Sequence, residues 1–441
     1  MKVAIYVVSK QAKQTYAEES FNVRKWPGMA IIKDALQRAG ITVGYCGIAD
    51  AHEQDVVLVS ITAACDWWPY IAERQQWKQG KQRVIIGGAG VLNVRPFLQW
   101  GDAFVFGRAE DFVADLVQEM AAGREIKHYS VCYPGSFAGS TYSMSFGSST
   151  YPHTVTLEDG NQWKERVIGC QNRCLFCGYT WQRRHIGGLH SSNNGDGLLG
   201  FALEKTLLEL DLEHPEAWET KSNKLRIVAI DGFSERLRRK VNKPITRERL
   251  RAFFHGLAKI APPHQIKIYN LVGLPGETAE DWREFKADLE AVDLELPAGK
   301  QWSIVLHNTP FRSMPATPAA HWPMSYRNYR GEIARALREP HHKGGIFFQG
   351  NRFWAVESMG TDSLATHILD AIVWRGLESD APLVDRLALT AKFWKADSKA
   401  KIATLEHNFD VKRLFAKYPK GGEPTAYLKS WWNTQVSGEQ T

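Results

Sequence analysis

Cys170-Gln171-Asn172-Arg173-Cys174-Leu175-Phe176-Cys177 is the stretch around which this 441-residue chain is organised. Half of the 6 cysteines fall within these eight positions, at the spacing CxxxCxxC. Two thiolates two residues apart commonly share one metal centre, because a short turn brings both sulfurs together. A structural zinc site needs four ligands, and no fourth cysteine or histidine follows at zinc-ribbon spacing. Three thiolates instead suit a 4Fe-4S cluster that keeps one iron open for a small molecule.

With an aromatic residue, Phe176, directly before its third cysteine, this stretch resembles the signature of the radical SAM enzymes. In that family the open iron binds S-adenosylmethionine (SAM), and one electron cleaves it to a 5′-deoxyadenosyl radical. The resemblance implies Cys170, Cys174 and Cys177 as cluster ligands and Phe176 as a neighbour of the cofactor. A zinc site completed by His185 stays open as an alternative. A disulfide scaffold is disfavoured, because the chain is long, cysteine is sparse and three cysteines are an odd number.

A second stretch, running from Asp231 to Thr246, follows a predicted buried strand. It resembles the Gly-Ser-Glu-Arg-Leu-Arg-Arg…Asn-Lys-x-Ile-Thr stretch of the same family, where small and acidic residues approach the methionyl or ribose groups of SAM. The resemblance implies Ser234 and Glu235 at the cofactor. It also implies Arg238 as a partner of the SAM carboxylate, since a guanidinium suits that planar anion.

A third stretch is a strand that runs into Gly273-Leu274-Pro275-Gly276-Glu277-Thr278. The family has this strand and turn close to the adenine of SAM, which implies Val272 and Gly273 as adenine neighbours. Glycines permit close approach to a flat ligand. We expect Glu277 to hold the turn. Thr278 and, earlier, Thr246 are predicted to cap the helices that follow them.

The stretch Ser303 to Phe311 resembles the closing strand of one subfamily, in which a cobalamin-binding domain precedes the barrel. Pro315, Thr317, Pro318 and Trp322 continue that resemblance. His307 is the one histidine at a strand end that faces the predicted site, and a structural role is favoured over a catalytic one. No catalytic residue is assigned.

Residues 1–125 contain continuous apolar strands that alternate with helical segments, which predicts a doubly wound, Rossmann-like parallel sheet. Ligands of such sheets bind at the carboxyl ends of the strands. There the order strand, Ser60-x-Thr62, helix, strand, Gly87-Gly88 resembles a cobalamin-binding domain, which implies Ser60, Thr62 and Gly88 as cofactor contacts. The cobalt-ligating DxHxxG motif is absent, so cobalamin binding stays open beside a plain sheet edge with small loop residues.

The predicted fold class is α/β with three parts. Residues 1–125 form the cobalamin-binding-like domain, residues 126–330 a partial TIM-type radical SAM barrel, and residues 331–441 a mainly helical C-terminal domain. In such a barrel, active sites lie at the carboxyl ends of the strands, where the cysteine stretch is expected. A hairpin is predicted between Gly345 and Val356, with Gly350-Asn351 as its turn.

Composition bounds the cellular setting and the partners. No apolar run approaches the length of a membrane span and no signal peptide begins the chain, so we expect a cytoplasmic protein without a membrane partner. The net charge of +7 permits an anionic partner. Among 16 tryptophans, the pairs Trp67-Trp68 and Trp431-Trp432 allow base stacking, although packing is the commoner use.

The predicted function is therefore that of a radical SAM enzyme acting on carbon. Methylation is expected if cobalamin binds, and a rearrangement of the isomerase or mutase type if it does not. The expected electron donor is a reductase or a protein of the flavodoxin or ferredoxin type. The substrate is left open between a small molecule and a nucleic-acid base, in RNA or hypermodified DNA. A non-catalytic cluster or zinc protein that binds nucleic acid is the alternative from another class.

Overall fold

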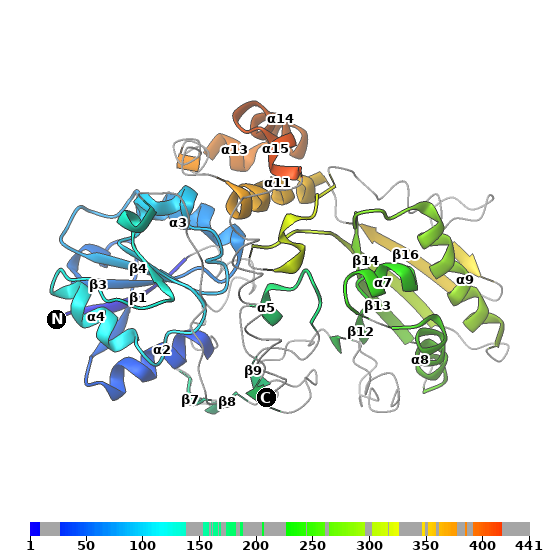
Figure 1. The fold of residues 1–441 in the computed structure, drawn as a ribbon, viewed down its shortest axis with the longest axis horizontal. Coiled ribbons are helices and arrows are strands. Elements are labelled where there is room, and N and C mark those ends of the chain that lie inside the picture. The colour runs from blue at the N-terminus through cyan, green and yellow to red at the C-terminus, as the bar shows by residue number, and fades with distance from the viewer. Residues whose placement is uncertain are drawn as a thin grey trace.

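In the computed structural model, the described residues are 1–8, 27–137, 153–157, 160, 162–165, 167–168, 173–181, 186–187, 205–206, 226–243, 245–260, 264–295, 302–315, 317–325, 346–348, 352–358, 361–376, 384–385 and 391–416. Two sheets lie at opposite ends of the longest axis, and a group of C-terminal helices lies above them (Figure 1). None of the described helices combines the length and the apolar character needed to cross a membrane.

The first sheet is the parallel sheet that the sequence predicts. Its strands are β1 (Val3–Val7), β2 (Val43–Cys46), β3 (Val56–Ser60), β4 (Arg83–Gly87), β5 (Ala103–Val105) and β6 (Val131–Cys132). Their order is β2-β1-β3-β4-β5-β6, and only β6 pairs antiparallel with its neighbour. This order reverses direction between β1 and β3, as in flavodoxin-like sheets.

Helices cover both faces of the first sheet, which explains why its strands are apolar throughout. In β3, Val56 and Leu58 pack against α2 (Pro27–Arg38) and α4 (Val113–Ala121). The alternate residues Val57 and Val59 join the opposite cluster, with α3 (Trp67–Arg74) and the 3₁₀ helix η4 (Arg95–Trp100). A strand with both faces buried needs an unbroken apolar run rather than alternation.

An ion pair joins the first sheet to the chain that leads into the cysteine stretch. The short hairpin of β7 (Thr154–Thr156) and β8 (Gln162–Lys164) ends at Glu165. Arg108, which follows β5, binds that carboxylate through both terminal nitrogens, at 2.7 and 2.9 Å. Such bidentate pairs fix orientation as well as distance. After the hairpin, β9 (Val167–Ile168) pairs antiparallel with β10 (Ile186–Gly187).

The second sheet contains β11 (Lys205–Thr206), β12 (Arg226–Ala229), β13 (His264–Val272), β14 (Trp302–Pro310), β15 (Ile346–Phe348) and β16 (Arg352–Ser358). Its order is β11-β12-β13-β14-β16-β15, parallel except for β15. The helices α8 (Arg247–Ile260) and α9 (Ala279–Glu295) lie on the side away from the first sheet (Figure 1). The described strands form an open run, so the closed part of the expected barrel is not shown.

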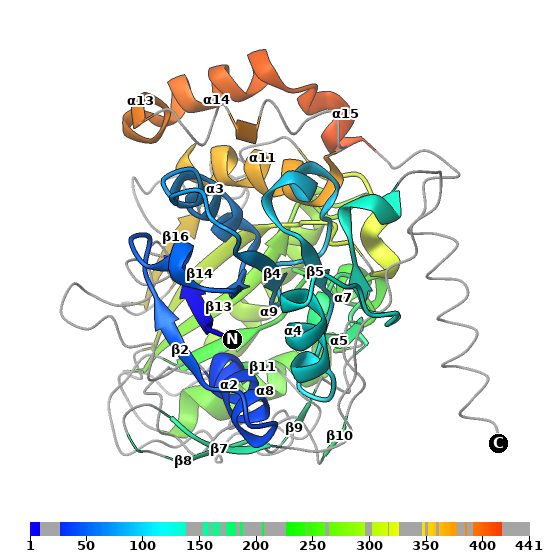
Figure 2. The same ribbon diagram turned by 90° about the vertical axis from the view of Figure 1, so that its left-hand side faces the viewer.

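Different parts of the chain after residue 330 pack with different sheets. The predicted hairpin is confirmed as β15 and β16, but β16 also pairs in parallel with β14 and so extends the second sheet. The helices that follow are α11 (Thr361–Arg375), α13 (Ala391–Lys395), α14 (Ser398–Asn408) and α15 (Val411–Phe415). They lie above α3 and belong to the core of the first sheet (Figure 2).

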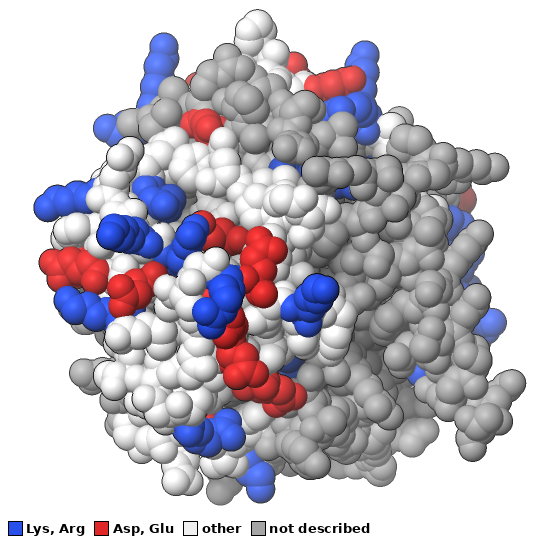
Figure 3. All heavy atoms as spheres, turned by 60° about the vertical axis from the view of Figure 1, so that its left-hand side comes forward, with Lys and Arg blue, Asp and Glu red and all other residues white. Residues whose placement is uncertain are grey.

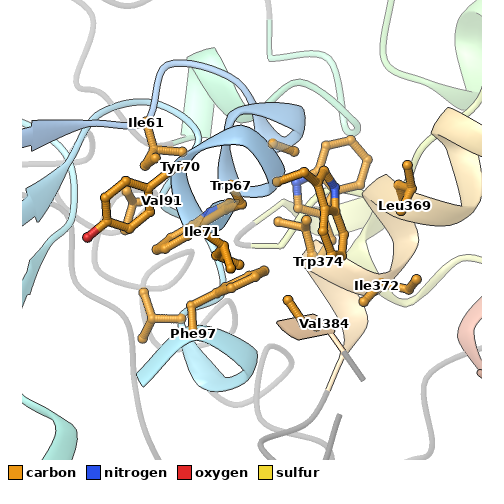
Figure 4. Packing of buried hydrophobic residues seen from close by; sticks show 14 of the residues in the cluster. Ile61, Trp67, Tyr70, Ile71, Val91, Phe97, Leu369, Ile372, Trp374 and Val384 are labelled. Carbon is orange, nitrogen blue, oxygen red and sulfur yellow. The ribbon is translucent and has the colours of Figure 1, made fainter. Parts of the chain in front are cut away.

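The tryptophan pair of the first sheet is packed and does not form a stacking surface. Trp67 and Trp68 are 0% and 1% exposed. The Trp67 ring stacks on Phe97 with 4.1 Å between ring centroids, and residues of α11 close over this cluster (Figure 4). The suggestion that this pair stacks nucleic-acid bases is therefore wrong, because neither ring is accessible. Trp431-Trp432 lies outside the described residues.

Candidate cofactor site

Two of the three predicted cluster ligands lie on one turn. The backbone N–H of Cys177 donates to the carbonyl of Cys174 at 3.1 Å, and neither thiol is in a disulfide. Cys174 is buried and Cys177 half-buried. Cys170 and His185 lie outside the described residues, and the part of the chain that is described holds no set of three metal-ligating side chains. The donor set present, two thiols on one turn, fits part of a cluster-binding loop.

The stretch from Asp231 to Thr246 binds the cysteine turn through the C-terminal end of its helix. The helix α7 (Glu235–Lys240) is followed by Val241 and Asn242. The carbonyl of Val241 accepts from the N–H of Leu175 at 3.0 Å. The side-chain amide of Asn242 donates to the carbonyl of Arg173 at 2.8 Å. These two bonds hold the backbone on either side of Cys174.

The turn is also held from its other side. The N–H of Ala319, in the 3₁₀ helix η7 (Pro318–His321), donates to the carbonyl of Leu175 at 2.9 Å. The indole of Trp181, in the short helix α5 (Gly178–Trp181), donates to the carbonyl of Cys174 at 2.8 Å. The backbone of residues 173–177 is therefore fixed by hydrogen bonds to three separate parts of the chain.

Phe176 lies in an apolar cluster to which each of the stretches singled out after residue 169 contributes. The buried members are Leu237, Val241, Leu274, Phe311 and Ala319, and the partly buried residues packed against them are Leu175, Phe176, Leu271 and Trp322. Leu271 lies near the end of β13, Leu274 belongs to the Gly-Leu-Pro-Gly-Glu-Thr turn that follows, and Phe311 follows β14. Four segments that are far apart in the sequence thus meet around the cysteine turn.

Ser234 is buried and structurally engaged. Its hydroxyl caps α7 by accepting from the N–H of Leu237 at 3.2 Å, and it donates to the carboxylate of Asp281. Asp281 also accepts from Arg236 at 2.6 Å and from the N–H of Thr278 at 2.8 Å. These bonds use the O–H and one lone pair of the hydroxyl, and the predicted contact of Ser234 with SAM stays a prediction.

Glu235, beside Ser234, is half-buried. One carboxylate oxygen accepts from Arg239 at 2.8 Å and the other from the N–H of Arg247 at 3.0 Å. These donors hold the pKa of Glu235 below its ordinary value. It stays anionic at neutral pH and remains the predicted SAM contact of this stretch with the greatest accessibility.

Arg238 is 0% exposed. Its Nε donates to the carbonyl of Ile245 at 2.8 Å, and Nη1 donates to the carbonyls of Gly232 and Phe233 at 3.2 and 2.9 Å. Burial lowers the pKa of Arg238 to about 10. A SAM carboxylate could reach this guanidinium only if the loop around it moved, so its predicted role stays untested.

Val272 is buried at the end of β13, and Gly273 follows with a φ of +79°, a conformation that favours glycine. Glu277 closes the turn, as predicted. One of its oxygens accepts from the N–H groups of Gly273 and Leu274 at 2.6 and 3.0 Å, and the other accepts from the indole of Trp282 at 2.6 Å. Burial raises the pKa of Glu277 to about 7.

Asp231 and Lys243 form an ion pair beside the cysteine turn that sequence reasoning missed. The Lys243 ammonium lies 2.6 Å from the Asp231 carboxylate and donates to the carbonyl of Ala229 at 2.6 Å. Asp231 has a φ of +55°, which is unusual for any residue except glycine. An aspartate directly at a strand end was the available signal. This pair ties the end of β12 to the residue that follows Asn242.

His307 lies beside Tyr269 on the middle strands of the second sheet. The two residues are register partners, and their ring centroids are 4.6 Å apart. Both are half-buried, whereas the alternate residues Ile268 and Leu306 are fully buried. Tyr269 shares a face with Leu271, which packs near Phe176. The expected orientation of His307 toward the site is therefore consistent with the strand register.

The predicted cobalamin contacts come together at the carboxyl edge of the first sheet. The hydroxyl oxygens of Ser60 and Thr62 are 3.5 Å apart. Gly88 has a φ of +110°, and a Cβ atom there would lie 2.5 Å from the carbonyl oxygen of Ile61. Glycine is thus required by the close approach of two loops, whether or not a ligand binds there.

No protein-family model matches the chain, and no curated protein matches it. Two solved structures of the cobalamin-dependent S-adenosylmethionine radical enzyme OxsB are similar to it. The form with aqua-cobalamin has 12% identity and a TM-score of 0.24 over 69% of this chain and 44% of that chain. The form with aqua-cobalamin and S-adenosylmethionine has 10% identity and a TM-score of 0.25 over 99% and 61%. The chain thus spans about half the length of OxsB. With such TM-scores, function has to be argued from the chain's own residues.

Proposed function

We propose that the chain is a radical SAM enzyme in which Cys170, Cys174 and Cys177 hold a 4Fe-4S cluster. When bound, the cluster would supply the electron that cleaves SAM and the open iron that binds it. The observation that carries the proposal is the meeting of distant stretches around Leu175 and Phe176. A protein that merely bound zinc would need the cysteine turn, but it would have no use for the α7 end and the Gly-Leu-Pro-Gly-Glu-Thr turn in the same place.

The chain's own residues would prepare the site in three ways. Hydrogen bonds to the carbonyls of Arg173, Cys174 and Leu175 hold the backbone of the cysteine turn. The apolar cluster around Phe176 excludes water from one side of the cysteine turn. Gly273, which has no side chain, would let the adenine approach the backbone beside the buried Val272, and Glu235 would offer an anion to the polar end of SAM.

The reaction type that we propose depends on whether the first sheet binds cobalamin. Ser60, Thr62 and Gly88 lie beside the point where the strand order of the first sheet reverses, where such sheets bind ligands. With cobalamin there, we propose methyl transfer to carbon. Without it, we propose a rearrangement, in either case with a reductase, flavodoxin or ferredoxin as the electron donor.

The substrate is proposed as a small molecule or a nucleic-acid base. Nucleic-acid binding typically rests on a continuous basic surface. On the described part of the face in Figure 3, Lys and Arg are interleaved with Asp and Glu. That face and the buried Trp67 and Trp68 give no support to nucleic-acid binding, so a small molecule is the first substrate class that we propose to test.

Anaerobic reconstitution with iron and sulfide tests the proposal. The wild-type protein should bind about four irons per chain and, with dithionite, convert SAM to 5′-deoxyadenosine. Cys174→Ala should lose most of the iron and all of the product. Cys46→Ala, which alters a cysteine of the first sheet, should behave as wild type. A Cys174→Ala protein that still forms 5′-deoxyadenosine, or a wild-type protein that takes up zinc but no cluster, would overturn the proposal.

A further inference from the structure

The helix α7 ends in a motif whose left-handed position is usually glycine. The N–H of Asn242 donates to the carbonyl of Arg239 at 3.0 Å, and the N–H of Lys243 donates to the carbonyl of Arg238 at 2.8 Å. This pair of bonds defines a Schellman motif, in which the residue after the cap adopts the left-handed conformation. Asn242 is that residue, with a φ of +58°.

Two other helices end in the same motif and place glycine at this position. At the end of α2, Gly40 has a φ of +76° and donates to Gln37, while Ile41 donates to Leu36. At the end of α4, Gly123 has a φ of +74° in the same arrangement. Glycine adopts this conformation without steric conflict, and asparagine tolerates it less well. Capping alone therefore does not explain the asparagine at position 242.

The side chain of Asn242 makes a hydrogen bond that a glycine could not make. Its amide donates to the carbonyl of Arg173 at 2.8 Å, the residue directly before Cys174. The preceding residue, Val241, accepts from the N–H of Leu175, directly after Cys174. The following residue, Lys243, reaches back to Asp231 and Ala229. Three successive residues of one helix end thus connect the cysteine turn to the end of β12.

We propose that Asn242 is a positioning residue for the cysteine turn. Its side-chain bond holds Arg173 so that the thiols of Cys174 and Cys177 are presented in a fixed geometry. The link to a cluster rests on the proposed function, whereas the hold on the turn does not. The role is one of positioning, because Asn242 bonds to the backbone of the turn and not to a thiol.

The decisive variant is Asn242→Gly, studied first in the metal-free protein. It keeps the backbone conformation of the helix end and removes the side chain, and with it the amide that binds Arg173. We expect the amide hydrogen of Leu175 to exchange roughly fivefold faster, as the loss of one neutral hydrogen bond implies. Cys174 and Cys177 should be alkylated faster by iodoacetamide, by a similar factor. The unfolding temperature should stay within a degree or two of the wild-type value or rise.

Gly40→Asn is the matched control, because it places asparagine in the same motif, and a Cβ at Gly40 meets no atom within 4 Å. If Asn242 served only as a cap, Asn242→Gly would stabilise the protein by as much as Gly40→Asn destabilises it. We expect a smaller gain, since Asn242→Gly also removes the bond to Arg173. The proposal is overturned if Asn242→Gly raises the stability by as much as Gly40→Asn lowers it. It is also overturned if amide exchange and alkylation at the cysteine turn are unchanged in Asn242→Gly.

The loaded protein gives a separate readout. After reconstitution, Asn242→Gly should release iron to a chelator several-fold faster than wild type and should change the electron paramagnetic resonance spectrum of the reduced cluster. If the wild-type protein takes up no cluster, the proposed function fails, but exchange and alkylation in the metal-free protein still decide the role of Asn242. If the wild type loads and the variant matches it in every readout, only the role of Asn242 is overturned.

Discussion

Glu277 is a residue on which burial and hydrogen bonding act in opposite directions. Burial favours the neutral acid, whereas the donors from Gly273, Leu274 and Trp282 favour the anion. Burial is the larger effect and raises the pKa from 4.5 to about 7. At neutral pH this carboxyl group, which holds the turn, is therefore divided between its protonated and ionised forms.

This shift makes the stability of the turn depend on pH. Because the folded pKa lies above the unfolded value, the stabilising contribution is complete below pH 4.5 and is lost as pH rises through 7. The shift corresponds to at most about 3 kcal/mol. Glu277→Gln does not titrate, so the difference in unfolding free energy between wild type and variant should fall by about 1–3 kcal/mol from pH 5 to pH 8.

Urea unfolding of both proteins at the two pH values measures this difference. Glu280→Gln is the control, since Glu280 lies three residues further on, in the first turn of α9, and is exposed. It should change the unfolding free energy little at either pH. A difference between wild type and Glu277→Gln that is the same at pH 5 and pH 8 would show that Glu277 does not titrate in this range.

The motifs predicted which segments form the site but not how individual side chains are arranged in it. The stretches identified which segments surround the cysteine turn, but they could not show which way each side chain turns. Arg238 points into the protein because its donors are used by carbonyls of its own loop. Asp231 and Asn242 belong to the second stretch, but their roles were not predicted, because their left-handed conformations depend on where a strand and a helix end, which sequence patterns place only within a few residues.

At the scale of elements, two helix caps differ in what their hydroxyl groups bind. Ser234 caps α7 and also donates to the buried Asp281. Thr246, confirmed as a cap, accepts from the N–H of Arg249 at 3.3 Å at the start of α8. Loss of a cap costs about 1 kcal/mol. A hydrogen bond to a charged group contributes about 1.5–3 kcal/mol more.

Ser234→Ala should therefore lower the unfolding free energy by about 2–4 kcal/mol, and Thr246→Ala by about 1 kcal/mol. Urea unfolding compares the two directly. Ser234→Thr should recover most of the loss, provided that the added methyl group fits. Equal losses for the two alanine variants would mean that the bond to Asp281 contributes nothing to stability.

The elements themselves were predictable where the signal is local. The strands of the first sheet are continuous apolar runs, and the pairing of β15 with β16 follows the Gly350-Asn351 turn signal of the sequence, which itself lies outside the described residues. The pairing of β16 with β14 was not predicted, because it joins residues about 50 positions apart and depends on the whole sheet. The same reason explains why the number of strands in the second sheet could not be read from the sequence.

On the scale of the whole molecule, the C-terminal helices complete the core of the first sheet. Leu369, Ile372 and Trp374 of α11 belong to the same buried cluster as Trp67 and Phe97 (Figure 4). The C-terminal end of α11 reaches the candidate site. Arg375, the last residue of α11, donates to the carbonyls of Ala320 and Trp322 at 3.1 and 2.6 Å, next to the residue that holds Leu175. The first sheet and the cysteine turn are thus connected through α11.

A cavity in α11 should consequently loosen the first sheet. Ile372 is 0% exposed, and its replacement by alanine should cost about 2–5 kcal/mol. Hydrogen exchange should then accelerate in β3 and α3 as well as in α11. Ile268→Ala, at an equally buried position of β13, should accelerate exchange in the second sheet and leave β3 unchanged. Were residues 361–416 a separate domain, Ile372→Ala would affect those residues alone, and a truncation after residue 360 would leave the first sheet folded.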